Sequence, residues 1–166
     1  MKKIGLLSDT HSFLDQKIFH HFTDCDEIWH AGDIGNLDVA EQLSNFKPLR
    51  AVYGNIDGAD LRAQFPQDQH FVCEGLKVWI THIGGYPPKY NSQVKKALAV
   101  NPPDIFICGH SHILRVMSDP KLNNMLYVNP GAAGKSGFHH IRTVIRFEIA
   151  DGKVGNMQVV ELGKRA

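Results

Sequence analysis

The sequence predicts an α/β protein in which two packed β-sheets are flanked by helices. Two features lead to this fold class. In the first half, short apolar strands alternate with helical segments, which is typical of a largely parallel sheet. In the second half, strands follow one another with few helices between them, which indicates a second, mixed sheet. The 166 residues are expected to form one domain, 1–166, because a single core can be buried at this length.

The first half is predicted to hold three strands and two helices. The strands are residues 3–7, 27–30 and 49–52, and each ends in a polar turn. Spaced apolar residues predict helices over residues 13–22 and near 36–46. In parallel sheets of this kind, ligands bind beyond the carboxyl ends of the strands. The polar turns are therefore the first place to look for a site.

The second half is predicted to be richer in strands. Residues 70–73 and 77–81 have the pattern of a hairpin, and residues 90–100 that of a helix ending before Pro102-Pro103. The remaining strands are expected at residues 104–108, near 114–117 and 125–128, and at 142–149 and 153–161, with a turn at Asp151-Gly152 between the last two.

Composition excludes several classes of protein. The net charge is +1 and there is no long run of Lys or Arg, so there is no strong nucleic-acid signature. The apolar run behind Met1 ends at Ser8-Asp9, which is too short for a signal sequence or a membrane span. We therefore expect a cytoplasmic protein with no membrane partner. Its three widely spaced cysteines are expected to be reduced thiols.

Side chains that bind metals follow most of the predicted strands. They lie at or just beyond the carboxyl ends, and they are Asp9, His11, Asp33, Asn55, His82, His110 and His112. Asp-x-His and His-x-His place residues i and i+2 on one side of an extended segment, so each pair can bind at one site. Several imidazoles together with carboxylates and an amide suit Mn, Fe, Ni, Co or Zn better than Mg. The sequence therefore predicts a metal site.

Three of these residues follow a glycine, at Gly32, Gly54 and Gly109. Glycine permits a positive φ and a close approach of the backbone, which would let the ligands turn toward a common centre. Taken singly, a Gly-Asp or Gly-Asn is usually only a turn, and a His-x-His is more often a hydrogen-bonded pair than a metal site. The ordered series of motifs, each after an apolar strand, is what indicates metal binding.

As an ordered set, the motifs resemble those of the calcineurin-like metallophosphoesterases, in particular the small bacterial and archaeal phosphodiesterase branch. The motifs are Asp9-Thr10-His11, Gly32-Asp33, Gly54-Asn55-Ile56-Asp57, Thr81-His82, Gly109-His110-Ser111-His112 and Val128-Asn129-Pro130-Gly131-Ala132. The resemblance implies a four-layer α/β/β/α fold, with a two-sheet β-sandwich flanked by helices. It also implies that the chain is a metal-dependent phosphoesterase, and it favours phosphodiesters over phosphomonoesters as substrates.

The resemblance further implies a binuclear metal centre. The first ion would be bound by Asp9, His11 and His112, the second by Asn55, His82 and His110, and both by Asp33. Asp33, Asn55 and His11 are expected to act in catalysis. The expected cofactors are two divalent metal ions, with manganese preferred and nickel, iron, cobalt or zinc as alternatives. They would activate a bridging water that attacks a small phosphate ester. Members of this branch often form dimers or larger assemblies, so a homo-oligomer is a further expectation.

Two positions depart from the family pattern. Ile56 stands where many members have a His that assists the transition state or protonates the leaving group, and the candidates to replace it are His139, His140, Lys135 and Arg142. His82 is followed by Ile83-Gly84-Gly85 where relatives commonly have Gly-His, so this loop is expected to shape the substrate pocket or to form a tight turn. Ile56 also keeps open the alternative of a scaffold protein on the same fold, like a retromer subunit. A single structural zinc site fits poorly because such sites are rich in Cys.

Overall fold

The computed structural model describes residues 1–166, and its strands form two five-stranded sheets. Sheet A contains, in spatial order, β12 (Lys153–Lys164), β11 (Ile141–Ala150), β1 (Lys2–Leu7), β2 (Glu27–His30) and β3 (Leu49–Ala51). Sheet B contains β4 (Asp68–Cys73), β5 (Leu76–Thr81), β8 (Ile105–Ile107), β10 (Met125–Asn129) and β9 (Arg115–Asp119). Two short strands pair with each other, β6 (Gly85–Tyr86) and β7 (Lys89–Tyr90).

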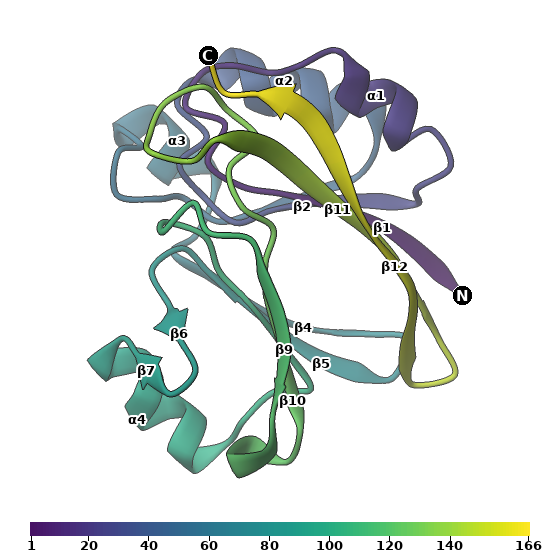
Figure 1. Ribbon diagram of the computed structural model, residues 1–166, viewed down its shortest axis with the longest axis vertical. Coiled ribbons are helices and arrows are strands. Elements are labelled where there is room, and N and C mark those ends of the chain that lie inside the picture. The colour runs from purple at the N-terminus through teal and green to yellow at the C-terminus, as the bar shows by residue number, and fades with distance from the viewer.

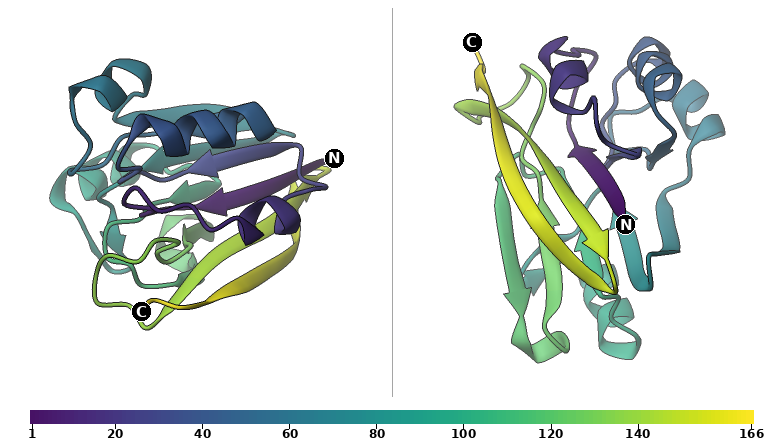
Figure 2. Two further views of the ribbon diagram at one scale, coloured as in Figure 1. Left: turned by 90° about the horizontal axis from the view of Figure 1, so that it is seen from above. Right: turned by 90° about the vertical axis from the view of Figure 1, so that its right-hand side faces the viewer.

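Helices cover the outer faces of both sheets (Figures 1 and 2). They are α1 (Lys17–His21), α2 (Leu37–Phe46), α3 (Ala59–Gln64), α4 (Ser92–Val100) and the 3₁₀ turn η1 (Pro120–Leu122). The first three pack on sheet A, and α4 packs on sheet B. This arrangement confirms the predicted four-layer α/β/β/α fold. None of the helices combines the length and the apolar character needed to cross a membrane.

The strands are buried on both faces because their side chains alternate. In β1, Leu6 faces the core between the sheets and Leu7 faces the core under α1 and α2. In β8, Ile105 faces the core between the sheets and Phe106 faces α4. This alternation explains the unbroken apolar runs of the sequence, and each such side chain contributes about 1.5–3 kcal/mol when buried. The three cysteines are buried free thiols, as predicted: Cys25, Cys73 and Cys108.

Both sheets are mixed, with parallel and antiparallel pairs of strands. In sheet A, β1 pairs parallel with β2 and β2 with β3, while β11 and β12 run antiparallel. In sheet B, β8 pairs parallel with β5 and β10. The prediction of parallel pairing is therefore correct for the first three strands. Hydrogen bonds between the loops, such as Gly109 N to His82 O at 3.0 Å, bring the carboxyl ends of the parallel strands together.

The helices differ from the sequence prediction at two boundaries and by one additional helix. Helix α1 begins at Lys17 and not at residue 13, because the Asp15 carboxylate accepts a hydrogen bond from Lys17 N and closes a turn. Helix α4 begins after Asn91, whose side chain caps it by accepting from Gln93 N. Helix α3 was not predicted, because it is one short segment with only Leu61 buried and shows no periodic pattern.

His30 ends β2 and joins two loops of the site. Its ring is fully buried. Nδ1 accepts from Gly32 N at 3.1 Å, so Nε2 carries the proton and donates to Thr10 Oγ1 at 3.0 Å. The Thr10 hydroxyl in turn donates to Ile34 O at 2.8 Å. Burial lowers the pKa of His30 to about 4, so the neutral ring is the form that fits this network.

We predict that His30 destabilises the metal-free protein as the pH falls. Its pKa is about 4 in the folded chain and 6.5 when unperturbed. The full contribution of neutral His30 to the free energy of unfolding is therefore present above pH 6.5 and is lost as the pH falls toward 4. The loss reaches about 2 kcal/mol at pH 5. Urea unfolding at pH 7.5 and 5 should show a smaller fall for His30→Gln than for the wild type. An NMR titration that gave His30 a folded pKa near 6.5 would contradict this account.

Candidate metal centre

Two groups of metal-binding side chains lie side by side where the parallel strands end. One group is Asp9, His11 and His112, and the other is Asp33, His82 and His110, with one donor atom from each residue within 4.8 Å of the others in its group. His112 Nε2 lies 3.2 Å from Asp9 Oδ1, and His82 Nε2 lies 3.2 Å from Asp33 Oδ2. Ligands that are each about 2.1 Å from one ion lie roughly 3.0–3.4 Å apart, so this spacing fits a metal.

Asp33 connects the two groups. Its Oδ2 lies 3.2 Å from His82 Nε2 in its own group and 3.4 Å from His11 Nε2 in the other. Asn55 lies beside the second group, with its Oδ1 3.0 Å from His110 Nδ1. All seven side chains that the sequence singled out are therefore brought together.

Each carboxylate has one oxygen held by the chain and one directed into the centre. Asp9 Oδ2 accepts from Ser8 Oγ at 2.7 Å and from the backbone N–H of His110 at 3.1 Å. Asp33 Oδ1 accepts from the backbone N–H of Ile56 at 3.1 Å. Asp9 Oδ1 and Asp33 Oδ2 are left to face the histidines, so these are the oxygens available to a cation.

Three buried polar atoms have no hydrogen-bond partner: Asp9 Oδ1, His11 Nε2 and His82 Nε2. Their contacts with one another and with the other side chains of the centre, at 3.2–3.8 Å, bring opposite charges close without hydrogen-bond geometry. A buried polar atom left unsatisfied costs about 1–3 kcal/mol, and more when it is charged. Three such atoms across the two groups fit bound cations, which would satisfy all of them.

Two histidines present Nε2 to the centre because Nδ1 is engaged elsewhere. His82 Nδ1 donates to Ala31 O at 2.7 Å. His139 Nε2 donates to Gly134 O at 2.8 Å, so its Nδ1 is an acceptor, and it lies 3.3 Å from His112 Nδ1. His112 therefore carries its proton on Nδ1 and has a free lone pair on Nε2. Partners of this kind fix the tautomer and the ring orientation of metal-binding histidines.

The opposing charges shift several pKa values in the metal-free chain. The facing carboxylates of Asp33 and then of Asp9 raise the pKa of His11 to about 9. Burial opposes ionisation of both aspartates, but the facing histidines outweigh it and hold the pKa of each carboxyl far below its usual range. Burial would lower the pKa of His82, yet the facing carboxylate of Asp33 raises it. The centre thus favours positive charge, whether protons or metal ions supply it.

The backbone of the centre is left-handed at most of the predicted ligands. Positive φ angles occur at Asp9 (54°), His11 (46°), Asp33 (55°), His110 (70°) and His112 (62°). Such angles are uncommon outside glycine and gather at functional sites. The expectation that Asp-x-His and His-x-His are extended is therefore wrong. The side chains converge because both residues of each pair turn left-handed.

The glycines beside these residues serve two purposes. Gly32 has a φ of +100°, as predicted, whereas Gly54 and Gly109 do not have a positive φ. These two are needed for close approach, because a Cβ on Gly54 would collide with Asp33 and one on Gly109 with Ser8. The loops can therefore pack against the carboxylates only if these positions lack a side chain.

Two further buried side chains hold the loops of the centre in place. The Asp57 carboxylate accepts hydrogen bonds from three backbone N–H groups, those of Ile34, Gly35 and Gly54. Asn129 Nδ2 donates to Gly109 O and Ser111 Oγ, both at 3.1 Å, which fixes the loop that carries His110 and His112. Asp57 and Asn129 therefore act through the loops they position.

Of the four residues considered as replacements for the missing histidine, only His139 reaches the centre, and it does so through His112. Arg142 is bound to Asp15 at 2.7 Å, Lys135 lies over the Phe13 ring, and His140 is exposed. The Ile56 side chain is 47% exposed.

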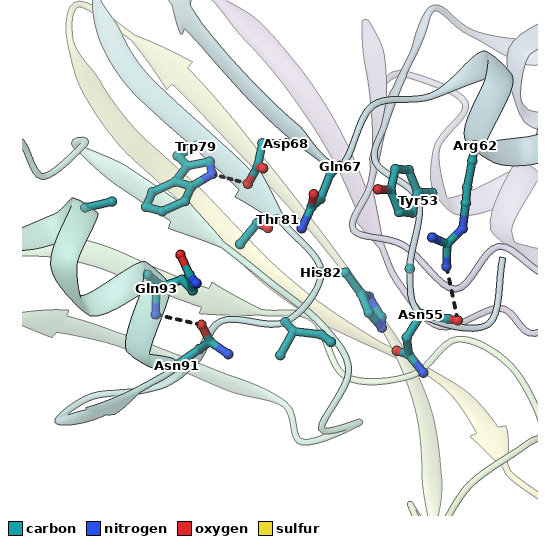
Figure 3. A pocket seen from close by; sticks show the side chains of 14 residues that line it. Tyr53, Asn55, Arg62, Gln67, Asp68, Trp79, Thr81, His82, Asn91 and Gln93 are labelled. Carbon is teal, nitrogen blue, oxygen red and sulfur yellow. Dashed lines mark hydrogen bonds between the residues drawn. The ribbon is translucent and has the colours of Figure 1, made fainter.

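A cleft of about 830 Å³ opens beside the second group (Figure 3). Asn55 and His82 border it on the side of the centre, and Ile83 from the loop after His82 also lines it. Its other polar residues, Arg62 and Gln67 among them, were missed by the sequence analysis. No motif marks these positions, and Arg62 lies on the helix α3 that was not predicted.

Comparison with known proteins agrees with this geometry. The profile of the calcineurin-like phosphoesterase superfamily domain matches residues 1–152. The chain belongs to the calcineurin-like phosphoesterase superfamily. A probable metallophosphoesterase of Methanothermobacter thermautotrophicus is 30% identical over 134 residues, which cover 78% of this chain and 76% of that protein.

Solved structures share the fold over nearly the whole chain. A structure described as a novel archaeal phosphodiesterase has a TM-score of 0.75 and 25% identity to this chain. The similarity covers 95% of this chain and 99% of that one. Vps29 of Entamoeba histolytica in complex with zinc has a TM-score of 0.76, 14% identity and 99% coverage of both chains. At that identity the second similarity concerns the fold alone.

We predict that Gly54→Ala displaces Asp33 from the centre. A methyl group there would collide with Asp33 Oδ1 and with the Asp33 backbone nitrogen. We expect the free energy of unfolding to fall by about 1–3 kcal/mol and metal affinity to fall with it. Gly58→Ala in the same loop is the control, because its Cβ would lie 3.6 Å from the nearest atom, of Asp60. Urea unfolding and calorimetric titration with manganese measure both effects, and wild-type values for Gly54→Ala would contradict the account.

Proposed function

We propose that this chain is a metal-dependent phosphodiesterase that hydrolyses small phosphate esters at a binuclear centre. The first ion would be held by Asp9, His11 and His112, the second by Asn55, His82 and His110, and both by Asp33. The main support is the convergence of these donors in two groups joined by Asp33, around three buried atoms that lack hydrogen-bond partners. Membership of the phosphoesterase superfamily supports the reaction class.

Two divalent ions, when bound, would polarise the phosphoryl oxygens and make a water nucleophilic near neutral pH. The residues of the chain supply position and charge. Asp33 is held by the Ile56 N–H on one oxygen and keeps the other between His11 and His82. His82 keeps its proton on Nδ1, bound to Ala31 O, so that Nε2 stays a ligand. No side-chain nucleophile is needed for hydrolysis by this arrangement.

The donor set favours manganese, with nickel, iron, cobalt and zinc as alternatives. It comprises four imidazoles, two carboxylates and one amide, a mixture that borderline divalent ions accept more readily than magnesium does. We further propose that residues 1–166 act as a single domain. A cytoplasmic location and assembly into a homo-oligomer stay predictions.

We predict metal-dependent hydrolysis of bis-p-nitrophenyl phosphate, faster than that of p-nitrophenyl phosphate. The protein is stripped with a chelator and assayed with Mn, Ni, Co, Zn or Mg added back. Asp33→Asn should lower the rate by more than about 100-fold, because it removes the negative charge shared by both groups. Loss of a residue that only supports a metal ligand typically lowers activity about 10–100-fold, so loss of charge on the ligand itself should cost more. Asp60→Asn on α3 is the matched control, since Asp60 is exposed and outside the centre.

The rival function is that of a binding protein on the same fold, which the structural similarity to Vps29 brings into consideration. It would be supported if no ester released p-nitrophenolate with any metal while calorimetry confirmed that the metal binds. Loss of activity in Asp33→Asn but not in Asp60→Asn would instead support the phosphodiesterase. The complete set of seven donors favours catalysis, because a scaffold does not require them.

We predict a steep dependence of the rate on the leaving group. Isoleucine cannot donate a proton, and Ile56 contributes only its backbone N–H to the centre. Dialkyl phosphates should therefore react more slowly than aryl diesters by about 10²–10⁴-fold beyond their difference in intrinsic reactivity, which is the usual effect of a lost general acid. Ile56→His should narrow this gap and Ile56→Leu should not. Similar rates for alkyl and aryl esters in the wild type would show that another group protonates the leaving group.

A further inference from the structure

The cleft beside the centre has the size and place of a substrate subsite. Its volume of about 830 Å³ falls in the range of roughly 300–1,000 Å³ that small-molecule sites occupy. It begins at Asn55 and His82, our proposed ligands of the second ion, and extends toward β4, β5 and the start of α4 (Figure 3). A phosphate held at the centre would therefore direct one of its ester groups into this cleft.

Neutral hydrogen-bonding groups from three segments face the cleft. Figure 3 shows Tyr53 and Gln67 on one side and Asn91 and Gln93, at the start of α4, on the other. Asn91 Oδ1 accepts from Gln93 N at 3.1 Å, so its Nδ2 remains available as a donor. The side-chain amides of Gln67 and Gln93 make no hydrogen bond within the chain. Both can donate to and accept from a ligand.

Asp68 supplies one fixed acceptor to the same space. Its Oδ1 accepts from Trp79 Nε1 at 2.9 Å. Trp79 is itself held by stacking on His70 and by an edge contact with Phe106, and the ring centroids are 5.0 Å apart in both pairs. The second carboxylate oxygen of Asp68 is therefore held in position for a hydroxyl or N–H group of a ligand.

The charges of the lining restrict what can bind. The only cation is Arg62, whose guanidinium lies 4.5 Å from the centre of the Tyr53 ring and whose Nε and Nη2 donate to the backbone oxygens of Asp57 and Asn55. A second phosphate group in the cleft would face the Asp68 carboxylate, while Arg62 already uses its Nε and Nη2 for two backbone oxygens. A long alkyl chain would instead cover the amides without pairing them, at a cost of about 1–3 kcal/mol for each polar group. Polyphosphates and lipid tails are thus disfavoured.

We propose that the cleft binds an uncharged, hydroxyl-bearing substituent of nucleoside size, so that the preferred substrates are phosphodiesters that carry a nucleoside. This inference rests on the proposed phosphodiesterase function and names its substrate class. A nucleoside offers sugar hydroxyls as donors to Asp68 and a heterocycle whose edge both donates and accepts, which matches the amides of Gln67 and Gln93.

Two diesters with the same leaving group test the proposal. They are thymidine 5′-(p-nitrophenyl phosphate) and methyl p-nitrophenyl phosphate. We expect kcat/KM to be at least about tenfold higher for the nucleoside ester, the effect of two or more added hydrogen bonds. Gln67→Ala, Gln93→Ala and Asp68→Asn should each lower this ratio several-fold, chiefly through KM. Gln158→Ala is the matched control, since Gln158 is exposed on β12 at the far edge of sheet A.

Equal kcat/KM values for the two esters, or a ratio that the three cleft variants leave unchanged, would overturn the inference while the phosphodiesterase proposal stands. If neither ester reacts, the phosphodiesterase proposal fails, and binding still tests the cleft. Thymidine at millimolar concentration should then shift the NMR signal of the Trp79 indole N–H, with Trp29 as the internal reference. The shift should be lost in the Gln67→Ala/Gln93→Ala double variant, and the absence of any shift in the wild type would overturn the inference.

Discussion

Two ionised carboxylates, Asp9 and Asp33, are buried at one end of the sandwich, and much of the surrounding structure serves to keep them charged and in place. Burying a carboxylate costs several kcal/mol unless it is paired and hydrogen-bonded. One oxygen of each is bound by donors of the chain, and the other faces imidazole nitrogens at 3.2–3.8 Å. A centre of this kind is stable only when positive charge fills it. Cation binding is therefore a physical requirement of these two residues before it is a matter of catalysis.

The strained loops of the centre depend on the regular parts of the fold. Left-handed residues such as Asp33 and His110 cost of order 1–3 kcal/mol each and persist where their surroundings determine them fully. Here the three apolar cores fix the strands, and backbone hydrogen bonds of 3.0 Å join the loops, including Asp9 N to Gly32 O and Gly134 N to Asp9 O. Strand packing thus supplies the free energy that holds the loops in conformations they would not adopt alone.

The sequence predicts the strands and the grouping of the candidate ligands better than the local geometry that joins them. Strands are predictable because apolar residues alternate between two cores, as Leu6 and Leu7 do, and metal-binding residues because they recur after strands. The start of α1 and the whole of α3 were not predicted, since single hydrogen bonds and one buried Leu61 decide them. The left-handed φ angles and the cleft arise from contacts between distant segments. A local pattern carries no record of such contacts.

Retention of the buried charged centre itself bears on whether the chain acts as a catalyst or as a scaffold. Replacing buried ionic groups by well-packed apolar side chains is often neutral or stabilising by about 1–4 kcal/mol. A chain that used this fold only to bind a partner would lose nothing in stability by such changes at Asp9, Asp33 or His82. Ile56, by contrast, is a half-exposed position whose contribution to the centre is a backbone N–H that any residue except proline can supply. The side chains that are costly to bury without a cation are all present at the centre, which is the arrangement expected of a chain that binds a cation there.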